Sequence, residues 1–170
     1  MALRNIVQRG DSILQKKCRD VTAFDEKLHI LLDDMKQTLA ESSGIGLAAP
    51  QVGILRRAVI VLETNVEEGE PEQMIELVNP EIMESSGMQI GPEGCLSVPG
   101  KFGIIERPEY VKVRAQNRNG EFFEVEGCGI TARCFCHELD HLEGILFTAL
   151  ADRLMSETEL EEYYAQQEKL

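Results

Sequence analysis

The residues with the clearest chemistry lie between positions 136 and 141, where the sequence contains the pattern H-E-x-x-H. On an α-helix, residues four apart differ by about 40° around the axis and about 6 Å along it. The imidazoles of His137 and His141 would therefore share one face and could bind one divalent metal. Glu138, at the flank of that face, could reach a water held there, as in a hydrolytic centre. A surface helix with this spacing by chance is the alternative, but the apolar residues around the motif favour a buried helix.

A catalytic metal needs a third protein ligand, and the sequence leaves this ligand open. Cys134 lies about 10 Å along the helix from His141, too far to share an ion with it, and Cys136 is rotated by about 100° from His137. Glu161, on a later acidic segment, would match the ligand set of thermolysin-like enzymes. Cys95, in P-E-G-C-L-S-V-P, is either a thiolate ligand on a rigid loop or a small buried apolar residue.

The segment G-I-G-L-A-A-P-Q at 44–51 superficially fits the dinucleotide-binding pattern G-x-G-x-x-A. That pattern requires a strand before it and a long helix after it, whereas here a predicted helix precedes it, and Pro50 and Gly53 would interrupt any helix after it. We therefore reject a dinucleotide site. The segment keeps a backbone that a ligand can approach closely, followed by the amide donor Gln51.

Composition places the chain among globular proteins, with 170 residues, 43% hydrophobic and 28% charged. A net charge of −13 argues against a nucleic-acid-binding surface. No apolar run approaches the roughly 20 residues that span a membrane, and no export signal is recognised at the N-terminus. The five cysteines are thus expected to be free thiols in a reducing compartment. We expect a cytoplasmic protein.

The elements that must position these residues can be predicted from hydrophobic spacing. A helix is predicted over 24–42, capped by Asp25, and strands over 57–63, 74–79, 110–116 and 121–125. The motif helix should begin near Thr131, capped by its hydroxyl, and end around 143–144. Ser156 begins a capping box for an acidic helix at about 156–170. We predict one α+β domain over 1–170, with small mixed or antiparallel sheets packed around a central metal-binding helix, and with N-terminal and C-terminal helices.

Taken together, G-I-G-L-A-A-P-Q at 44–51, E-G-C-L-S at 93–97 and H-E-L-D-H at 137–141 resemble the three signature segments of peptide deformylases. The resemblance implies a metal-dependent hydrolase of protein biosynthesis that removes the formyl group from N-formylmethionyl polypeptides and releases formate. It also implies that Cys95 joins His137 and His141 around one divalent metal per chain. Fe²⁺ is the expected metal and Zn²⁺ the alternative.

The resemblance further implies roles for residues around the metal. Glu138 would move protons, while the Gln51 side-chain amide and the Leu96 backbone N–H would stabilise the oxyanion. The peptide would pair like an added strand between two backbone segments, Ile45 and Gly46 on one side and Glu93 and Gly94 on the other. The methionine side chain would fill an apolar pocket whose wall is formed by Ile130, Cys134 and the face of His137.

Two features depart from the family pattern. Cys136 stands where glutamine is usual, which predicts altered packing rather than lost activity. The final helix is acidic, whereas some bacterial members have a basic tail that docks to the ribosome. We therefore expect a monomer that acts on peptides emerging from the ribosome, with no direct nucleic-acid or membrane binding.

The alternative functions are an H-E-x-x-H endopeptidase using Glu161 and a structural zinc-site protein, although paired cysteines at the usual spacing are lacking.

Overall fold

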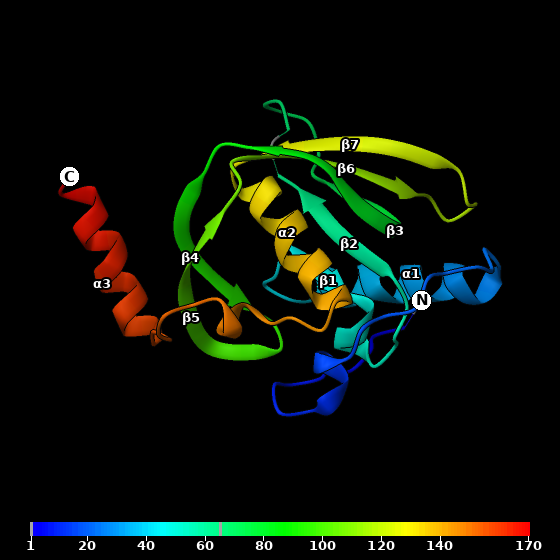
Figure 1. Cartoon of the computed structure of the whole chain (residues 1–170), viewed down its shortest axis with the longest axis horizontal. Helices are drawn as coiled ribbons and strands as arrows, with labels where there is room; N and C mark the ends of the chain where they lie inside the picture. Colours follow the sequence, from blue (N-terminus) through cyan, green and yellow to red (C-terminus); the bar gives the residue numbers. More distant parts are fainter. Residues whose placement is uncertain (1, 65) are drawn as a thin grey trace.

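The computed structural model describes residues 2–64 and 66–170, and its ribbon is shown in Figure 1. The helices are α1 (Glu26–Ala40), α2 (Ile130–Leu142) and α3 (Glu157–Glu168), and short 3₁₀ turns lie at Ser12–Gln15, Ala49–Val52 and Phe147–Ala149. The strands are β1 (Gly46–Ala48), β2 (Ala58–Glu63), β3 (Gln73–Ser86), β4 (Gln89–Cys95), β5 (Val98–Arg107), β6 (Tyr110–Gln116) and β7 (Phe122–Cys128).

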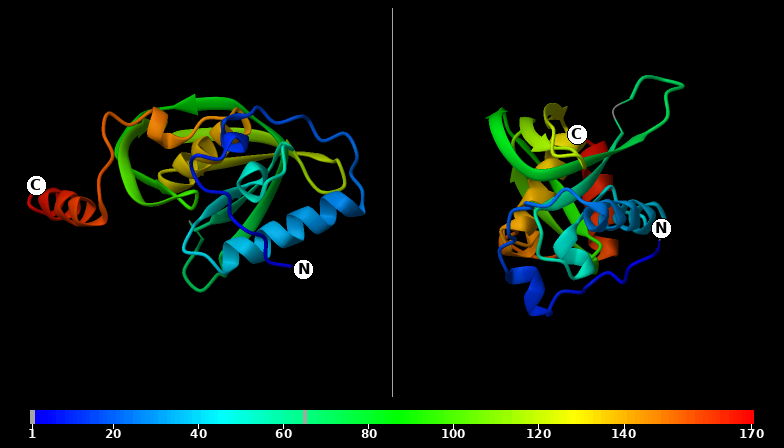
Figure 2. Two further views of the ribbon diagram at one scale, coloured as in Figure 1. Left: turned by 90° about the horizontal axis from the view of Figure 1, so that it is seen from below. Right: turned by 90° about the vertical axis from the view of Figure 1, so that its right-hand side faces the viewer.

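A five-stranded antiparallel sheet in the order β1-β2-β3-β6-β7 forms the centre of the fold. Alternate residues of β2 are buried on opposite faces, because successive side chains of a strand point to opposite sides. Val59 and Val61 pack in the cluster that contains α2, whereas Ala58 and Ile60 pack with α1. The two helices therefore cover opposite faces of the sheet (Figures 1 and 2).

Strands β4 and β5 form a separate antiparallel hairpin, which curves past α2 in Figure 1. Val98, Ile105 and Phe147 form a small core beneath it, against which Cys95 packs. The sequence pattern predicts a rigid loop between two prolines around Cys95. In the structure, Pro92 instead pairs with Ile104 inside the hairpin, and Cys95 is the last residue of β4.

The α+β class is confirmed, and the named sheets are antiparallel rather than mixed. Asp25 caps α1 through a hydrogen bond from the Leu28 N–H, and Ser156 begins the predicted capping box of α3. The predicted cap of α2 is wrong. Gly129 is the N-cap, and Thr131 lies within the first turn, where its hydroxyl donates to Glu63 of β2.

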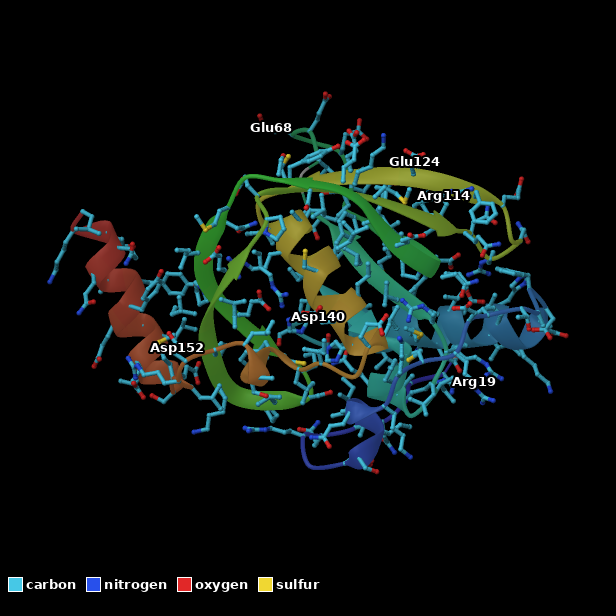
Figure 3. All side chains as sticks on the ribbon, viewed as in Figure 1. Arg19, Glu68, Arg114, Glu124, Asp140 and Asp152 are labelled. Carbon is cyan, nitrogen blue, oxygen red and sulfur yellow. The ribbon has the colours of Figure 1, made fainter. Side chains whose placement is uncertain are left out.

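Charged side chains populate the surface of the sheet away from α2, where Figure 3 labels Arg114 and Glu124. Asp140, labelled near the middle of the same view, lies on α2 instead. Among the described residues, none of the helices combines the length and apolarity that a transmembrane span requires.

Candidate active site

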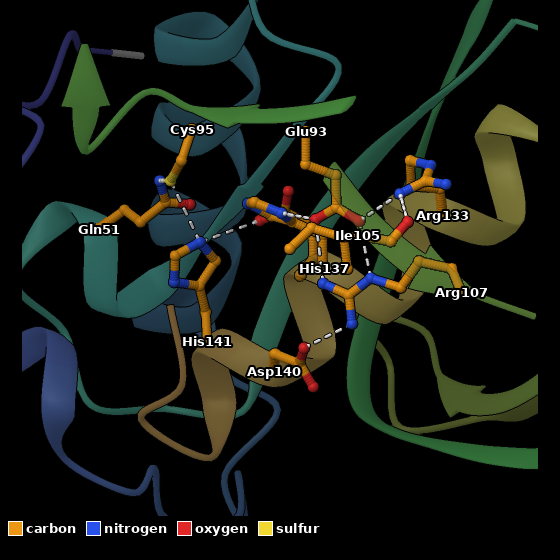
Figure 4. A network of polar contacts seen from close by, with 10 residues as sticks. Gln51, Glu93, Cys95, Ile105, Arg107, Arg133, His137, Asp140 and His141 are labelled. Carbon is orange, nitrogen blue, oxygen red and sulfur yellow. Dashed lines mark hydrogen bonds and ion pairs between the residues drawn. The ribbon is translucent and has the colours of Figure 1, made fainter. Parts of the chain in front are cut away.

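Helix α2 and the end of β4 bring the three predicted ligands together (Figure 4). His137 and His141 are buried, with ring centroids 5.1 Å apart. Cys95 Sγ lies 3.5 Å from His141 Nε2, and the ligand atoms of Cys95, His137 and His141 all lie within 4.8 Å of one another. Protein–metal bonds of about 2.0–2.3 Å allow atoms this close to share one ion. Glu161 is exposed on α3 and does not belong to this cluster.

The surroundings of the histidines fit a metal. Glu93 binds His137 Nδ1 at 2.8 Å, which leaves Nε2 as the available ligand atom. Burial lowers the pKa of His141 to about 3, so its ring is neutral, as a ligand must be. Burial also lowers the pKa of His137, but hydrogen bonds with Cys95 and Glu93 outweigh this and raise it to about 10. Metal binding would therefore release a proton from His137.

Glu138 is 4% exposed, and its Oε1 atom lacks a hydrogen-bond partner among the described residues. This oxygen lies 4.0 Å from His141 Nε2, beside the ligand cluster and not bonded to it. Burial raises the pKa of Glu138 to about 7, close to the value that suits a group that both accepts and donates protons. An unpaired buried carboxylate oxygen next to three ligand atoms has the properties of a proton carrier.

A buried ion-pair network holds Glu93, for which the sequence predicts only a role in peptide binding (Figure 4). Arg107 donates to both Glu93 oxygens, at 2.7 and 3.0 Å, and also to Asp140 at 2.7 Å. Arg133 donates to Glu93 at 2.7 Å. Burial would raise the pKa of Glu93, but the hydrogen bonds from Arg107 and His137 outweigh it and lower the pKa to about 2. Glu93 is thus an anion whose side chain orients His137.

Sequence reasoning missed the roles of Arg107, Arg133 and Asp140. Asp140 follows His137 by three residues, so helix spacing places both near one face. Asp140 also lies on a largely buried helix, where a charged side chain needs a partner of opposite charge. That partner, Arg107, lies on a strand that hydrophobic spacing does not predict.

Gln51 is almost fully buried at the edge of the ligand cluster. Its Oε1 accepts a hydrogen bond from the Ala48 N–H at 2.9 Å, which fixes the orientation of the side-chain amide. Its Nε2 therefore points to Ser97 Oγ, at 3.2 Å, and Cys95 Sγ, at 3.5 Å. The amide is a pre-oriented donor beside the ligand cluster.

A cleft of about 650 Å³ opens beside the cluster, within the usual range of roughly 300–1,000 Å³ for ligand sites. Gln51 and Leu96 line this cleft. So do all the residues predicted to bind the peptide, namely Ile45, Gly46, Glu93, Gly94, Ile130 and Cys134. Cys134 is buried, whereas Ile130 is 60% exposed and forms part of the rim. Cys136 packs in the core with the sheet, as expected for a side chain directed away from the ligands.

Gly46 is required by close packing against α2. A Cβ at this position would lie 2.5 Å from Glu138 Oε2 and 2.7 Å from Cys134 Sγ. Gly46→Ala should therefore displace Glu138 and lower kcat/KM by about 10²-fold, since shifts near 1 Å can cost this much. Steady-state kinetics of the purified variant would measure the loss.

Gly91→Ala is a matched control on the opposite wall. Its added Cβ would lie 3.5 Å from Arg133 Nη2, an ordinary contact distance. This variant should lose much less activity than Gly46→Ala. Equal rates for Gly46→Ala and the unmodified protein would contradict the requirement for glycine.

Comparisons with known proteins agree with this geometry. Residues 3–157 match the sequence family described as polypeptide deformylase. A peptide deformylase of Caldicellulosiruptor bescii is 50% identical over 170 residues, covering 100% of this chain and 98% of that protein. A crystal structure of a peptide deformylase from Legionella pneumophila superposes with a TM-score of 0.81 at 38% identity, covering 99% and 95% of the two chains. The Met-Ala-Ser-bound peptide deformylase of Acinetobacter baumannii gives 0.80 at 40% identity, covering 88% and 98%.

Proposed function

The chain belongs to the peptide deformylase family, and we propose that the cleft beside Cys95, His137 and His141 is its active site. The protein is a metal-dependent hydrolase that removes the formyl group from N-formylmethionyl nascent polypeptides and releases formate. The observation that carries the proposed site is the convergence of the three ligand atoms within 4.8 Å, beside Glu138 and next to the cleft that Cys95 and His137 line.

We propose Fe²⁺ as the metal, on the basis of the family resemblance, with Zn²⁺ as the alternative. One thiolate and two imidazoles suit both ions. When bound, the metal would act as a Lewis acid and lower the pKa of a bound water. Glu93 contributes from outside the ligand set. By fixing the tautomer and orientation of His137 it prepares the site for metal, and Arg107 and Arg133 keep Glu93 ionised.

The residues around the metal would supply proton transfer and stabilisation of the oxyanion. Glu138 accepts the proton of the attacking water and delivers it to the departing amine, a cycle suited to a pKa raised to about 7 by burial. The Gln51 amide, held by Ala48, and the Leu96 backbone N–H would stabilise negative charge on the formyl oxygen. Burial of this centre excludes bulk water, which strengthens both contributions.

The substrate enters as an extended strand between β1 and β4, contacting the backbone at Ile45, Gly46, Glu93 and Gly94. Its methionine side chain packs against Ile130, Cys134 and His137. The Acinetobacter relative is bound to Met-Ala-Ser, which supports a peptide as the occupant of this cleft. We further propose a cytoplasmic monomer. Direct nucleic-acid contact is not expected, because α3 carries five glutamates. The endopeptidase alternative is not favoured, since Glu161 lies outside the ligand cluster.

The substrate prediction compares formyl-Met-Ala-Ser with acetyl-Met-Ala-Ser. The acetyl peptide should be cleaved at least about 10²-fold more slowly, because its extra methyl would crowd the space between the metal ligands, Gln51 and Leu96. Formate and acetate release would be measured anaerobically, with the metal content quantified. Formate release with one metal per chain supports the proposal, whereas similar rates for both peptides would contradict a close-fitting site.

A further inference from the structure

The cleft is lined at one point by α3, which lies beyond the residues matched by the family except for its first residue. Tyr164 of α3 lines the same cleft as Ile90 of β4 and Lys101 and Phe102 of β5. In Figure 1, α3 lies beside the β4–β5 hairpin and away from the five-stranded sheet. An element outside the central fold thus contributes one aromatic side chain to the cleft.

The position of α3 is fixed at its first residues. The segment that leads into it exchanges two backbone hydrogen bonds with β5, from Phe102 N–H to the Met155 carbonyl at 3.0 Å and from Met155 N–H to the Phe102 carbonyl at 2.7 Å. The Ser156 capping box then starts the helix, and an ion pair between Arg153 and Glu159 ties its first turn to the preceding segment. The start of the helix is therefore held against β5.

Packing alone does not account for Tyr164. Helix α3, all of whose residues the structure describes, contains no fully buried side chain. Tyr164 is 51% exposed, and Ile90, which lines the same cleft, is 63% exposed. Large, half-exposed apolar side chains that face a common cleft are suited to contact with a ligand. Tyrosine serves well here because its ring offers a rigid contact area at a low cost in conformational entropy.

The direction in which the peptide lies in the cleft follows from where its formyl group must react. The formyl group is the amino-terminal end of the substrate, and it must reach the centre formed by Cys95 and the buried side chains of His137 and Glu138. The part of the peptide beyond the methionine must then run outward along the cleft.

We propose that Tyr164 is a specificity-determining residue that contacts the peptide downstream of the methionine, so that α3 favours longer formyl peptides. This inference rests on the proposed function.

The test compares formyl-Met-Ala with formyl-Met-Ala-Ser-Val in the full-length, metal-loaded protein. The ratio of kcat/KM for the long over the short peptide should exceed one and should fall by about 3–10-fold in Tyr164→Ala, the scale of one aromatic contact. The loss should appear in KM for the long peptide, with kcat and the activity on formyl-Met-Ala unchanged. Alanine favours helix, so α3 should stay folded. Tyr164→Phe should retain the ratio.

Tyr163→Ala is the matched control, because Tyr163 neighbours Tyr164 with ring centroids 5.9 Å apart but does not line the cleft. It should keep the normal ratio. An unchanged ratio in Tyr164→Ala, a ratio near one in the unmodified protein, or an equal loss in Tyr163→Ala would each overturn the inference. If the unmodified protein releases no formate from either peptide, the proposed function fails, and the role of Tyr164 fails with it.

Discussion

Replacing Glu138 with alanine should lower kcat by about 10²–10⁴-fold while the protein keeps one metal per chain. The side chain is buried beside the ligand cluster, with Oε1 4.0 Å from His141 Nε2, but it is not one of the three converging ligands. Its loss removes the group that takes the proton from water and returns it to the amine. KM should change far less, since Glu138 does little for ground-state binding. Formate-release kinetics and metal analysis of one preparation would measure both quantities.

Glu138→Gln separates proton transfer from packing, because it keeps the size of the side chain and removes its basicity. It should be about as inactive as Glu138→Ala, with the fold and metal content retained. Loss of the metal in both variants would instead make Glu138 a ligand. Near-normal kcat with a bound metal would mean that another group carries the proton.

The helix-borne half of this site could be predicted from local sequence. His137, Glu138 and His141 lie within one helical turn or so, where the periodicity of a helix fixes their relative directions. The same local rules identified the Asp25 cap and the Ser156 capping box. Chemistry that depends on spacing along one element can thus be read from the sequence.

The remaining half depends on contacts between residues distant in sequence, which spacing does not determine. Cys95 reaches His141 across 46 residues, and from the residues alone it was equally plausible as a buried apolar side chain. The family resemblance predicts it as a ligand, and the pairing of β4 with β5 places its Sγ near the two imidazoles. That hairpin was missed because its glycines and prolines indicate turns more strongly than strands. The Glu93–Arg107 pair, which spans the hairpin, was missed with it.

Replacing Cys95 with serine should remove the metal or change which metal the protein retains, and activity should fall with it. A thiolate is a far stronger anionic ligand than a neutral hydroxyl, and its Sγ is one of the three atoms within 4.8 Å. Losing a direct ligand should cost more than the roughly 10–100-fold in metal affinity that the loss of an outer contact costs. Affinity would be measured by competition with a chelator, and turnover by formate release at saturating Fe²⁺ and Zn²⁺.

Two other cysteines, Cys128 and Cys136, provide controls for this result. Cys128 is exposed and Cys136 is buried on α2 away from the ligands, so Cys128→Ser and Cys136→Ala should keep one metal per chain and near-normal kcat. His137→Ala should resemble Cys95→Ser, because each removes one of the converging atoms, whereas Glu138→Ala should not. This pattern distinguishes ligands from the proton carrier by metal content alone, before any rate is compared. A Cys95→Ser protein that is folded, holds its metal and turns over at the full rate would show that the third ligand is another residue.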